Sequence, residues 1–214
     1  DADQLLKRGK NFFARSILFG IAAISPTGDL AAFATGTREV QVLRLETGER
    51  LATFTGTESP IALLEFSPDG RTLAVASEGE ELYLWAIANG DALRLRGPVG
   101  RIRTIQFHPD GDFLAATGSD PNIHLWKPGE SNVFLQLKGH QRGITNFTFR
   151  AGGQQLASIS ENLEVKLWNL QDGLEIATFN WGASDSTTHP FWSLQFSSDG
   201  NSLAGMHGTR IRLW

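Results

Sequence analysis

The sequence predicts an all-β chain in which one four-stranded antiparallel sheet is repeated. The first observation is alternation: short runs such as 144–149 and 156–160 alternate apolar and polar residues and are separated by turns. This pattern is typical of half-buried strands joined by tight turns. The second observation is recurrence, marked by the turn glycines Gly28, Gly70, Gly111, Gly153 and Gly200. Successive glycines are separated by 42, 41, 42 and 47 residues.

Two further positions keep the same period. Before the turn glycine, the markers are Ile24, Phe66, Phe107, Phe149 and Phe196. At the end of the third run, the markers are Leu43, Trp85, Trp126, Trp168 and Trp214. Because one such unit cannot bury its apolar face alone, we expect the repeats to form a single array over residues 1–214.

Short motifs recur inside these repeats. They are Phe-Ser-Pro-Asp-Gly at 66–70, Phe-His-Pro-Asp-Gly at 107–111, Gly-His at 139–140 and the Leu-Trp endings at 84–85, 125–126, 167–168 and 213–214. With these motifs the chain resembles the WD-repeat β-propellers, whose repeats of about 40–45 residues are four-stranded blades. It departs from them where the Asp expected after Trp is Ala86, Lys127 or Asn169, and where only one Gly-His pair is present.

The predicted repeats span residues 10–55, 56–97, 98–138, 139–180 and 181–214. Residues 3–9 match residues 91–97 in register, and 91–97 hold an expected outer strand. We therefore expect residues 1–9 to be the outer strand that completes the last blade and closes a five-bladed ring. Such closure would hide both open sheet edges. The alternative is a fragment of a larger propeller, which the resemblance suggests would have seven blades.

Composition narrows the class of protein. The 214 residues include no cysteine, so the chain has no disulfide, thiolate metal site or cysteine nucleophile. A net charge of −4 argues against general nucleic-acid binding. We expect no membrane span, because no 18-residue apolar run is present. No signal peptide is recognised, so a cytoplasmic location is expected, although the chain begins at Asp1 and a longer polypeptide stays open.

The resemblance implies a buried hydrogen-bond relay in the best-preserved repeat. Its members would be His140, Ser158, Asn162 at the position where Asp is expected, and Trp168. The indole N–H of a buried Trp is only a donor and needs an acceptor. Because Asn carries no charge, we expect a neutral His140. A catalytic triad of His140, Ser158 and Asn162 is the alternative, but geometry rather than spacing defines triads.

The turn acids suggest no metal or cofactor site. Asp69, Asp110 and Asp199 could be read as calcium ligands, but their runs supply one or two oxygens where a calcium loop needs several. We interpret them as turn residues, because Asp bonds its own backbone next to Pro and Gly. We also expect no cofactor, since no phosphate-binding glycine loop is followed by a helix.

Aromatic residues supply the first candidate partner-binding site. Phe12 and Phe13 lie in one long connection, and Trp181 and Trp192 lie in or beside another at 181–191. The resemblance implies that such connections share one face around the propeller channel. Exposed aromatic clusters mark interfaces. The alternative is that these rings pack on one another and only brace the connections.

Arg101 and Arg103 supply a second candidate, together with Thr145, which occupies the position of Arg103 in the next repeat. Cationic clusters bind acidic peptides, phosphate or nucleic acid, although most charge runs are only solvated faces. We predict a non-catalytic scaffold or sensor for a protein or peptide, within a larger regulatory or signalling protein whose other domains are possible partners. An enzyme acting on a small molecule, or an acidic-ligand or nucleic-acid binder, is the alternative.

Overall fold

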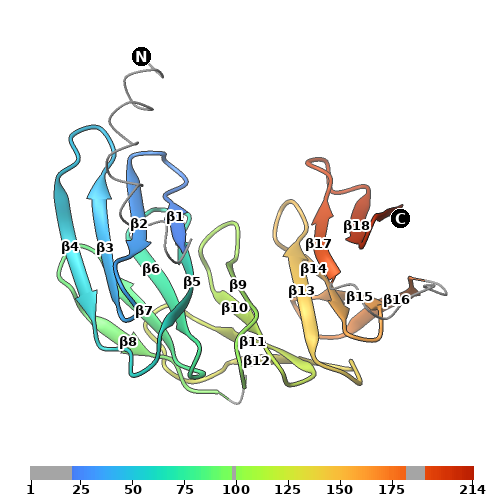
Figure 1. Cartoon of the computed structure of the whole chain (residues 1–214). Coiled ribbons are helices and arrows are strands. Elements are labelled where there is room, and N and C mark those ends of the chain that lie inside the picture. Colours follow the sequence, from blue (N-terminus) through green and yellow to red (C-terminus); the bar gives the residue numbers. More distant parts are fainter. Residues whose placement is uncertain (1–20, 98–99, 182–190) are drawn as a thin grey trace. The chain divides into compact units, whose positions relative to one another are not determined.

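A computed structural model describes residues 21–97, 100–181 and 191–214, with the side chains of Phe191 and Trp192 outside the described part. The chain forms two compact units, Asp1–Ala92 and Leu93–Trp214. The described residues form antiparallel sheets and turns and no helix, which confirms the all-β prediction (Figure 1). No helix within these ranges is long and apolar enough to cross a membrane.

Two four-stranded sheets begin in unit 1. The first contains β1 (Ala22–Ile24), β2 (Leu30–Ala34), β3 (Glu39–Arg44) and β4 (Arg50–Thr55). The second contains β5 (Ile61–Phe66), β6 (Thr72–Ser77), β7 (Leu82–Ala86) and β8 (Ala92–Arg94). One apolar core joins them, and within it the rings of Phe54 and Trp85 stack at 4.6 Å. Each sheet thus buries an apolar face that it could not bury alone.

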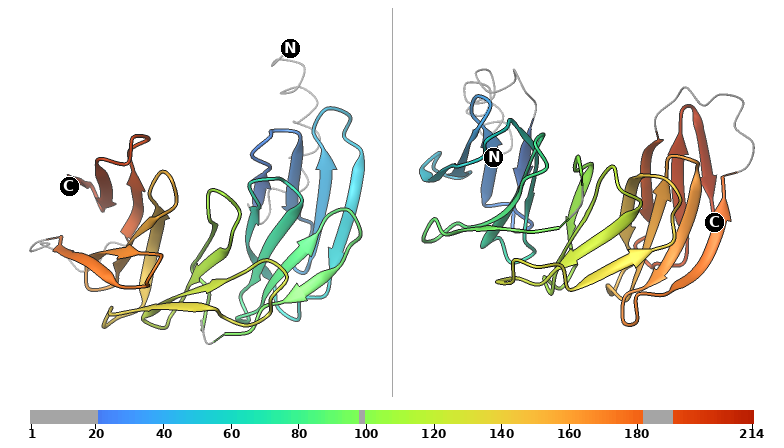
Figure 2. Two further views of the ribbon diagram at one scale, coloured as in Figure 1. Left: turned by 180° about the vertical axis from the view of Figure 1, so that it is seen from behind. Right: turned by 90° about the horizontal axis from the view of Figure 1, so that it is seen from below.

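Unit 2 continues the pattern with three sheets. The first contains β9 (Thr104–Phe107), β10 (Leu114–Thr117), β11 (Asn122–Trp126) and β12 (Leu135–Lys138). The second contains β13 (Ile144–Phe149), β14 (Gln155–Ser160), β15 (Glu164–Asn169) and β16 (Glu175–Asn180). The third contains β17 (Phe191–Phe196), β18 (Leu203–His207) and β19 (Arg210–Leu213). Figure 2 shows from two further directions that consecutive strands stay adjacent within each sheet.

The third and fourth strands of a sheet pair by a common rule. In β15 and β16, Val165 lies opposite Phe179, and the next residue, Lys166, lies opposite Thr178. The pair Ile123 and Leu137 repeats the apolar contact in the preceding sheet. Side chains alternate between the two faces of a strand, so each outer strand covers one apolar face and adds polar residues to the other.

Strand β19 lacks a fourth strand among the described residues. Its Ile211 and Leu213 are 71% and 72% exposed, whereas Val165, at the position of Ile211 in the previous sheet, is fully buried. The predicted closing strand at 3–9 and the connection at 10–18 lie outside the described residues, so closure stays a prediction.

Neighbouring hairpin turns of unit 2 pack directly on one another. The Nε2 atom of His108 lies 3.1 Å from the carbonyl oxygen of Gly153 in the next sheet. Gly153 has φ of +70°, and a Cβ at this position would lie 2.0 Å from that nitrogen. Gly153 therefore satisfies both a left-handed turn and a close contact between sheets.

Candidate functional site

One edge of unit 2 gathers three of the predicted partner-binding residues. In each antiparallel sheet, the start of the first strand and the turn between the second and third strands lie at the same end. In the first two sheets of unit 2, this end is formed by residues 100–104, 118–121, 141–145 and 160–163. These four segments are called the arginine edge. They place Arg101, Arg103 and Thr145 on two neighbouring sheets.

An ion pair crosses the arginine edge between the two sheets. Arg103 Nη2 lies 2.5 Å from Glu161 Oε1, and the two side chains are 32% and 45% exposed. A pair this exposed contributes up to about 1 kcal/mol to stability. Its main effect is to hold the Arg103 side chain over the neighbouring turn, where the charges of Arg103 and Glu161 compensate each other.

Ser119 is the centre of the arginine edge. The backbone N–H of Arg101 donates to Ser119 Oγ at 3.1 Å. On the other side, a Cβ at Gly143 would lie 3.0 Å from the Ser119 carbonyl oxygen. The buried Gly143 therefore lets the start of the next sheet approach this turn closely, with Arg142 exposed directly before it. Sequence reasoning missed Ser119, Arg142 and Glu161, because no linear spacing connects them with Arg101.

Thr145 has a structural as well as a positional role. Its hydroxyl donates to the Ile159 carbonyl at 3.2 Å, and its own carbonyl accepts the Thr104 hydroxyl at 3.4 Å. The strand pairing skips Thr145, which marks a bulge in β13. The same irregularity occurs at Ala62 and at Trp192. Bulges are common beside functional sites, and the first strands depart from regular pairing at Thr145 and Trp192, two of the predicted partner-binding residues.

The predicted aromatic cluster is not assembled among the described residues. Phe12 and Phe13 lie outside them, as does the side chain of Trp192. Trp181 is only 6% exposed and belongs to a core cluster between the last two sheets. Its ring meets Trp214 edge-on at 5.3 Å. Trp181 therefore fits the alternative that these rings brace the connections, because its ring packs in the core and is not available to a partner.

The predicted relay forms around Ser158. His140 Nε2 and Trp168 Nε1 each lie 2.8 Å from Ser158 Oγ. The other imidazole nitrogen, Nδ1, lies 3.2 Å from the Glu164 carboxylate. His140, Ser158 and Trp168 are all buried. The three residues thus meet as the resemblance implied, but a different residue supplies the fourth group.

The prediction for Asn162 needs correction, because Asn162 lies in the turn before β15 and accepts a hydrogen bond from Ser160 at 2.5 Å. Glu164 begins β15 and shares a face of that strand with Trp168, since side chains of alternate residues point the same way. Ser158 pairs with Lys166 between them. The period-two rule, applied backwards from Trp168, would have identified Glu164 from sequence.

Donors and acceptors assign the protons of the relay. An ionised Glu164 only accepts, so His140 donates to it through Nδ1–H, and Nε2 accepts the Ser158 hydroxyl proton. Ser158 Oγ in turn accepts the N–H of Trp168. Burial lowers the pKa of His140 to about 4, and Glu164 acts in the opposite direction. Desolvation therefore outweighs the carboxylate, and the neutral His140 that was predicted has a cause other than a missing charge.

A buried lysine extends the relay outward. Lys166 Nζ lies 2.8 Å from both Glu175 Oε2 and Thr178 Oγ1 on the outer strand, and 3.5 Å from Glu164. Its hydrogen bond and that of Thr178 hold the pKa of Glu175 below its usual range. Buried charges need such partners, so this network ties the outer strand to the relay.

Other sheets satisfy their polar groups differently. Trp126 donates its indole N–H to the Arg96 carbonyl at 3.0 Å, because Ala116 occupies the position of Ser158 in this sheet. His124 Nε2 instead lies 2.7 Å from Asp120. In the second sheet of the chain, the buried Glu81 accepts the Ser77 hydroxyl and the backbone N–H of Glu58. In these two sheets, buried polar groups therefore have hydrogen-bond partners that differ from the Ser–His pair of the relay.

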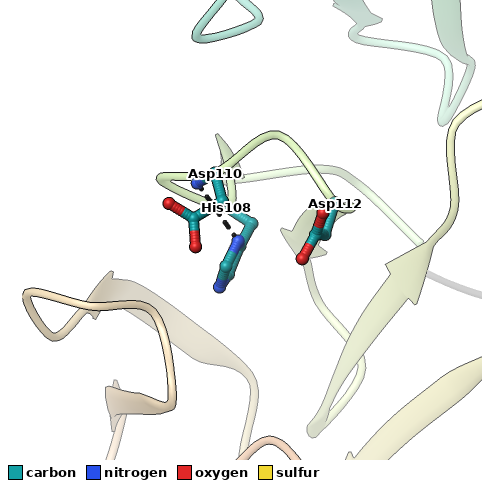
Figure 3. Close-up of side chains that lie close together, drawn as sticks. All are labelled: His108, Asp110 and Asp112. Atoms are coloured by element: carbon teal, nitrogen blue, oxygen red, sulfur yellow. Dashed lines mark hydrogen bonds between the residues drawn. The ribbon is translucent and has the colours of Figure 1, made fainter.

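His108, Asp110 and Asp112 lie close enough together to suggest a metal site, and Figure 3 shows Asp110 and Asp112 near the imidazole ring. The ring nitrogens are already engaged, however. His108 Nδ1 accepts the backbone N–H of Asp110 at 3.2 Å, and Nε2 faces the Gly153 carbonyl. A metal ion would have to break one of these hydrogen bonds. The arrangement therefore fits a turn residue that joins two sheets better than a ligand.

The other turn acids have the partners that turn chemistry predicts. Asp69 accepts the Ser67 hydroxyl at 2.6 Å and the Arg71 N–H at 3.0 Å. These two bonds hold the pKa of the Asp69 carboxyl below its usual range. Asp199 repeats the arrangement with the Ser197 hydroxyl at 2.5 Å. Both carboxylates therefore act as acceptors that close their own turns.

Comparisons with known families agree with the repeated sheets. Residues 22–97 match the model described as the anaphase-promoting complex subunit 4 WD40 domain. Residues 92–127 and 131–169 each match the model of the WD domain, G-beta repeat. No curated protein matches the chain significantly. The matched repeats, the four-stranded antiparallel sheets and the His–Ser–Trp relay place this chain in the WD-repeat family.

Proposed function

We propose that this chain is a non-catalytic scaffold or sensor that docks a protein or peptide partner through its arginine edge and the bulged first-strand positions. WD-repeat domains generally mediate protein interactions as scaffolds. The partner is another protein or another domain of the same polypeptide. The observation that carries the proposal is the arginine edge itself: exposed charged side chains stand on turns of two neighbouring sheets, and an ion pair and a hydrogen bond connect these sheets.

Rigid presentation supports docking. A surface that is already ordered loses little conformational entropy on binding. The Thr104 hydroxyl bonds the Thr145 backbone across two sheets, and Gly143 packs against the Ser119 backbone. These contacts leave the exposed side chains of Arg101 and Arg142 as the adaptable part of the surface. Arginine is common at interfaces because its planar guanidinium binds several acceptors at once.

The relay geometry argues against the catalytic alternative. Ser158 is fully buried, and its oxygen already accepts from Trp168 and donates to His140. A nucleophilic serine must reach a substrate carbonyl, and a general base must be free to take its proton. His140 Nε2 does face the Ser158 hydroxyl, but the first condition fails because the fully buried Ser158 cannot reach a substrate carbonyl. Its chemistry is that of a buried hydrogen-bond network that orients Trp168.

Site-specific photo-crosslinking tests the proposal. A benzophenone amino acid replaces exposed Gln141 on the arginine edge or, as a control, exposed Arg71 in a hairpin turn at the other end of its sheet. We expect discrete crosslinked partners from position 141 in a lysate of the source organism, and none of the same partners from position 71. The same partners should be lost in Trp192→Ala with an unchanged melting temperature. Equal crosslinking from both positions, or turnover of a small molecule by the chain, would overturn the proposal.

A further inference from the structure

We propose that Arg101 and Arg142, on the two sides of Ser119, form a clamp for one anionic side chain of a peptide partner, either a carboxylate or a phosphorylated residue. This inference rests on the proposed function, because it names the partner chemistry of the same edge. It concerns two arginines that come from different sheets and are 41 residues apart in sequence.

Backbone contacts bring the two arginines together. The N–H of Arg101 lies 3.1 Å from Ser119 Oγ. A Cβ on Gly143 would lie 3.0 Å from the Ser119 carbonyl oxygen. Arg142 directly precedes Gly143, and consecutive Cα atoms are about 3.8 Å apart. Both side chains are therefore rooted beside the same serine. Each is long enough to lean over that serine, so one anion above Ser119 is within reach of both.

Local charge favours an anion at this place. Glu161 neutralises Arg103 at 2.5 Å. Arg101 and Arg142 are both exposed and have no ion-pair partner among the residues that the structure describes. Arginine stays charged at any physiological pH. The arginine edge thus carries Arg101, Arg103 and Arg142 against Glu161 and Asp120, an excess of one positive charge on a chain whose net charge is −4. Asp120 is held by His124 and Asn122, which leaves Arg101 and Arg142 to meet the ligand.

Ser119 adds a third donor. Its oxygen accepts from Arg101, which leaves the hydroxyl proton available to a ligand. Two guanidinium groups and one hydroxyl can together satisfy the two oxygens of a carboxylate or the three of a phosphate. Bidentate arginine contacts to such groups are among the strongest hydrogen bonds in proteins. The donors therefore match a single compact anion.

The same features disfavour a nucleic acid. Binding to nucleic acid needs several phosphate contacts along a basic surface. Here Glu161, 45% exposed, stands beside the clamp, and the whole chain is acidic. A single anionic side chain in an otherwise neutral peptide meets the two arginines without meeting repeated repulsion. A peptide is therefore the better fit.

Oriented peptide libraries test the clamp. Three fluorescent libraries share random flanks and differ only in a fixed central phosphoserine, glutamate or serine. With the wild-type protein we expect fluorescence anisotropy to show at least about tenfold tighter binding of one anionic library over serine. The two anionic arms distinguish a phosphorylated from an acidic residue. Arg101→Gln and Arg142→Gln should each reduce this preference by about threefold, and the double variant should abolish it.

The matched control removes two positive charges elsewhere, with Arg71→Gln combined with Lys138→Gln, both exposed. It should keep the preference. Equal binding of all three libraries, or equal loss in the control, would overturn the clamp. If the clamp is wrong, crosslinking from Gln141 would still detect docking at the arginine edge, so the experiments can reject the clamp and keep the proposed function. Tight, steeply salt-dependent binding of single-stranded oligothymidylate that needs Arg101 and Arg142 would also overturn it, in favour of nucleic acid.

Discussion

Replacing Ser158 with alanine tests the relay most directly. The substitution is nearly isosteric and removes only the oxygen on which His140 and Trp168 converge, each at 2.8 Å. It leaves the Trp168 N–H without an acceptor and His140 Nε2 without a donor, in a place where both rings are buried. Each unsatisfied buried group costs about 1–3 kcal/mol.

We therefore expect Ser158→Ala to lower the free energy of unfolding by about 3 kcal/mol. For a domain of this size, each kcal/mol shifts the melting temperature by roughly 2–4 °C, which predicts a fall of about 10 °C. Urea titration followed by tryptophan fluorescence and thermal circular dichroism measure the two quantities.

A double-mutant cycle with Trp168→Phe separates the orphaned indole from other effects of Ser158→Ala. With the donor gone, removing the Ser158 oxygen should cost less, so the two substitutions should be non-additive by at least about 0.5 kcal/mol. A loss below about 0.5 kcal/mol for Ser158→Ala alone, or strict additivity, would refute the view that Ser158 satisfies both rings.

Three further predictions concern pH, sheet contacts and the open edge. Burial lowers the pKa of His140 from its ordinary value of 6.5 to about 4, so the stabilisation should be complete above pH 6.5. The free energy of unfolding should fall by about 3 kcal/mol toward pH 4, because there the unfolded chain binds a proton that the folded chain does not bind. In His140→Asn the urea midpoint should change less with pH across this window, and an equal pH dependence in the variant and the wild type contradicts the assignment. Gly153→Ala should lower the free energy of unfolding by about 2 kcal/mol or more in urea titrations, because φ is +70° and the new Cβ would lie 2.0 Å from His108. Adding His108→Ala should recover only the part of this loss that comes from the clash. Additive losses in the double variant would show that no clash occurs. Ile211→Lys should reduce the concentration-dependent association that light scattering detects and leave the melting temperature unchanged, because the Ile211 side chain is 71% exposed on an edge strand. A clear fall in melting temperature would instead show that another strand covers β19.

Much of the fold could be predicted from the sequence, because its causes are local and repeated. Alternation in runs such as 144–149 predicts strands, and a period set by turn glycines predicts that each sheet is the same unit. The resemblance to WD-repeat proteins implied that His140, Ser158 and Trp168 form one relay, and it agrees with the need of a buried indole for an acceptor. The error at Asn162 arose because position in a repeat was followed instead of the side-chain period of β15, which points Glu164 toward His140.

Tertiary packing decided the rest. Only the approach of two sheets brings Arg142 and Glu161 to Ser119 and Arg103, since these residues belong to different repeats. The sequence by itself determined an array of antiparallel sheets, because strand alternation acts within one repeat, and its resemblance to WD repeats implied most of the relay. The tertiary structure decided which charges face each other and that His140 stays neutral beside a carboxylate, because desolvation and contacts between repeats depend on burial that no single repeat encodes.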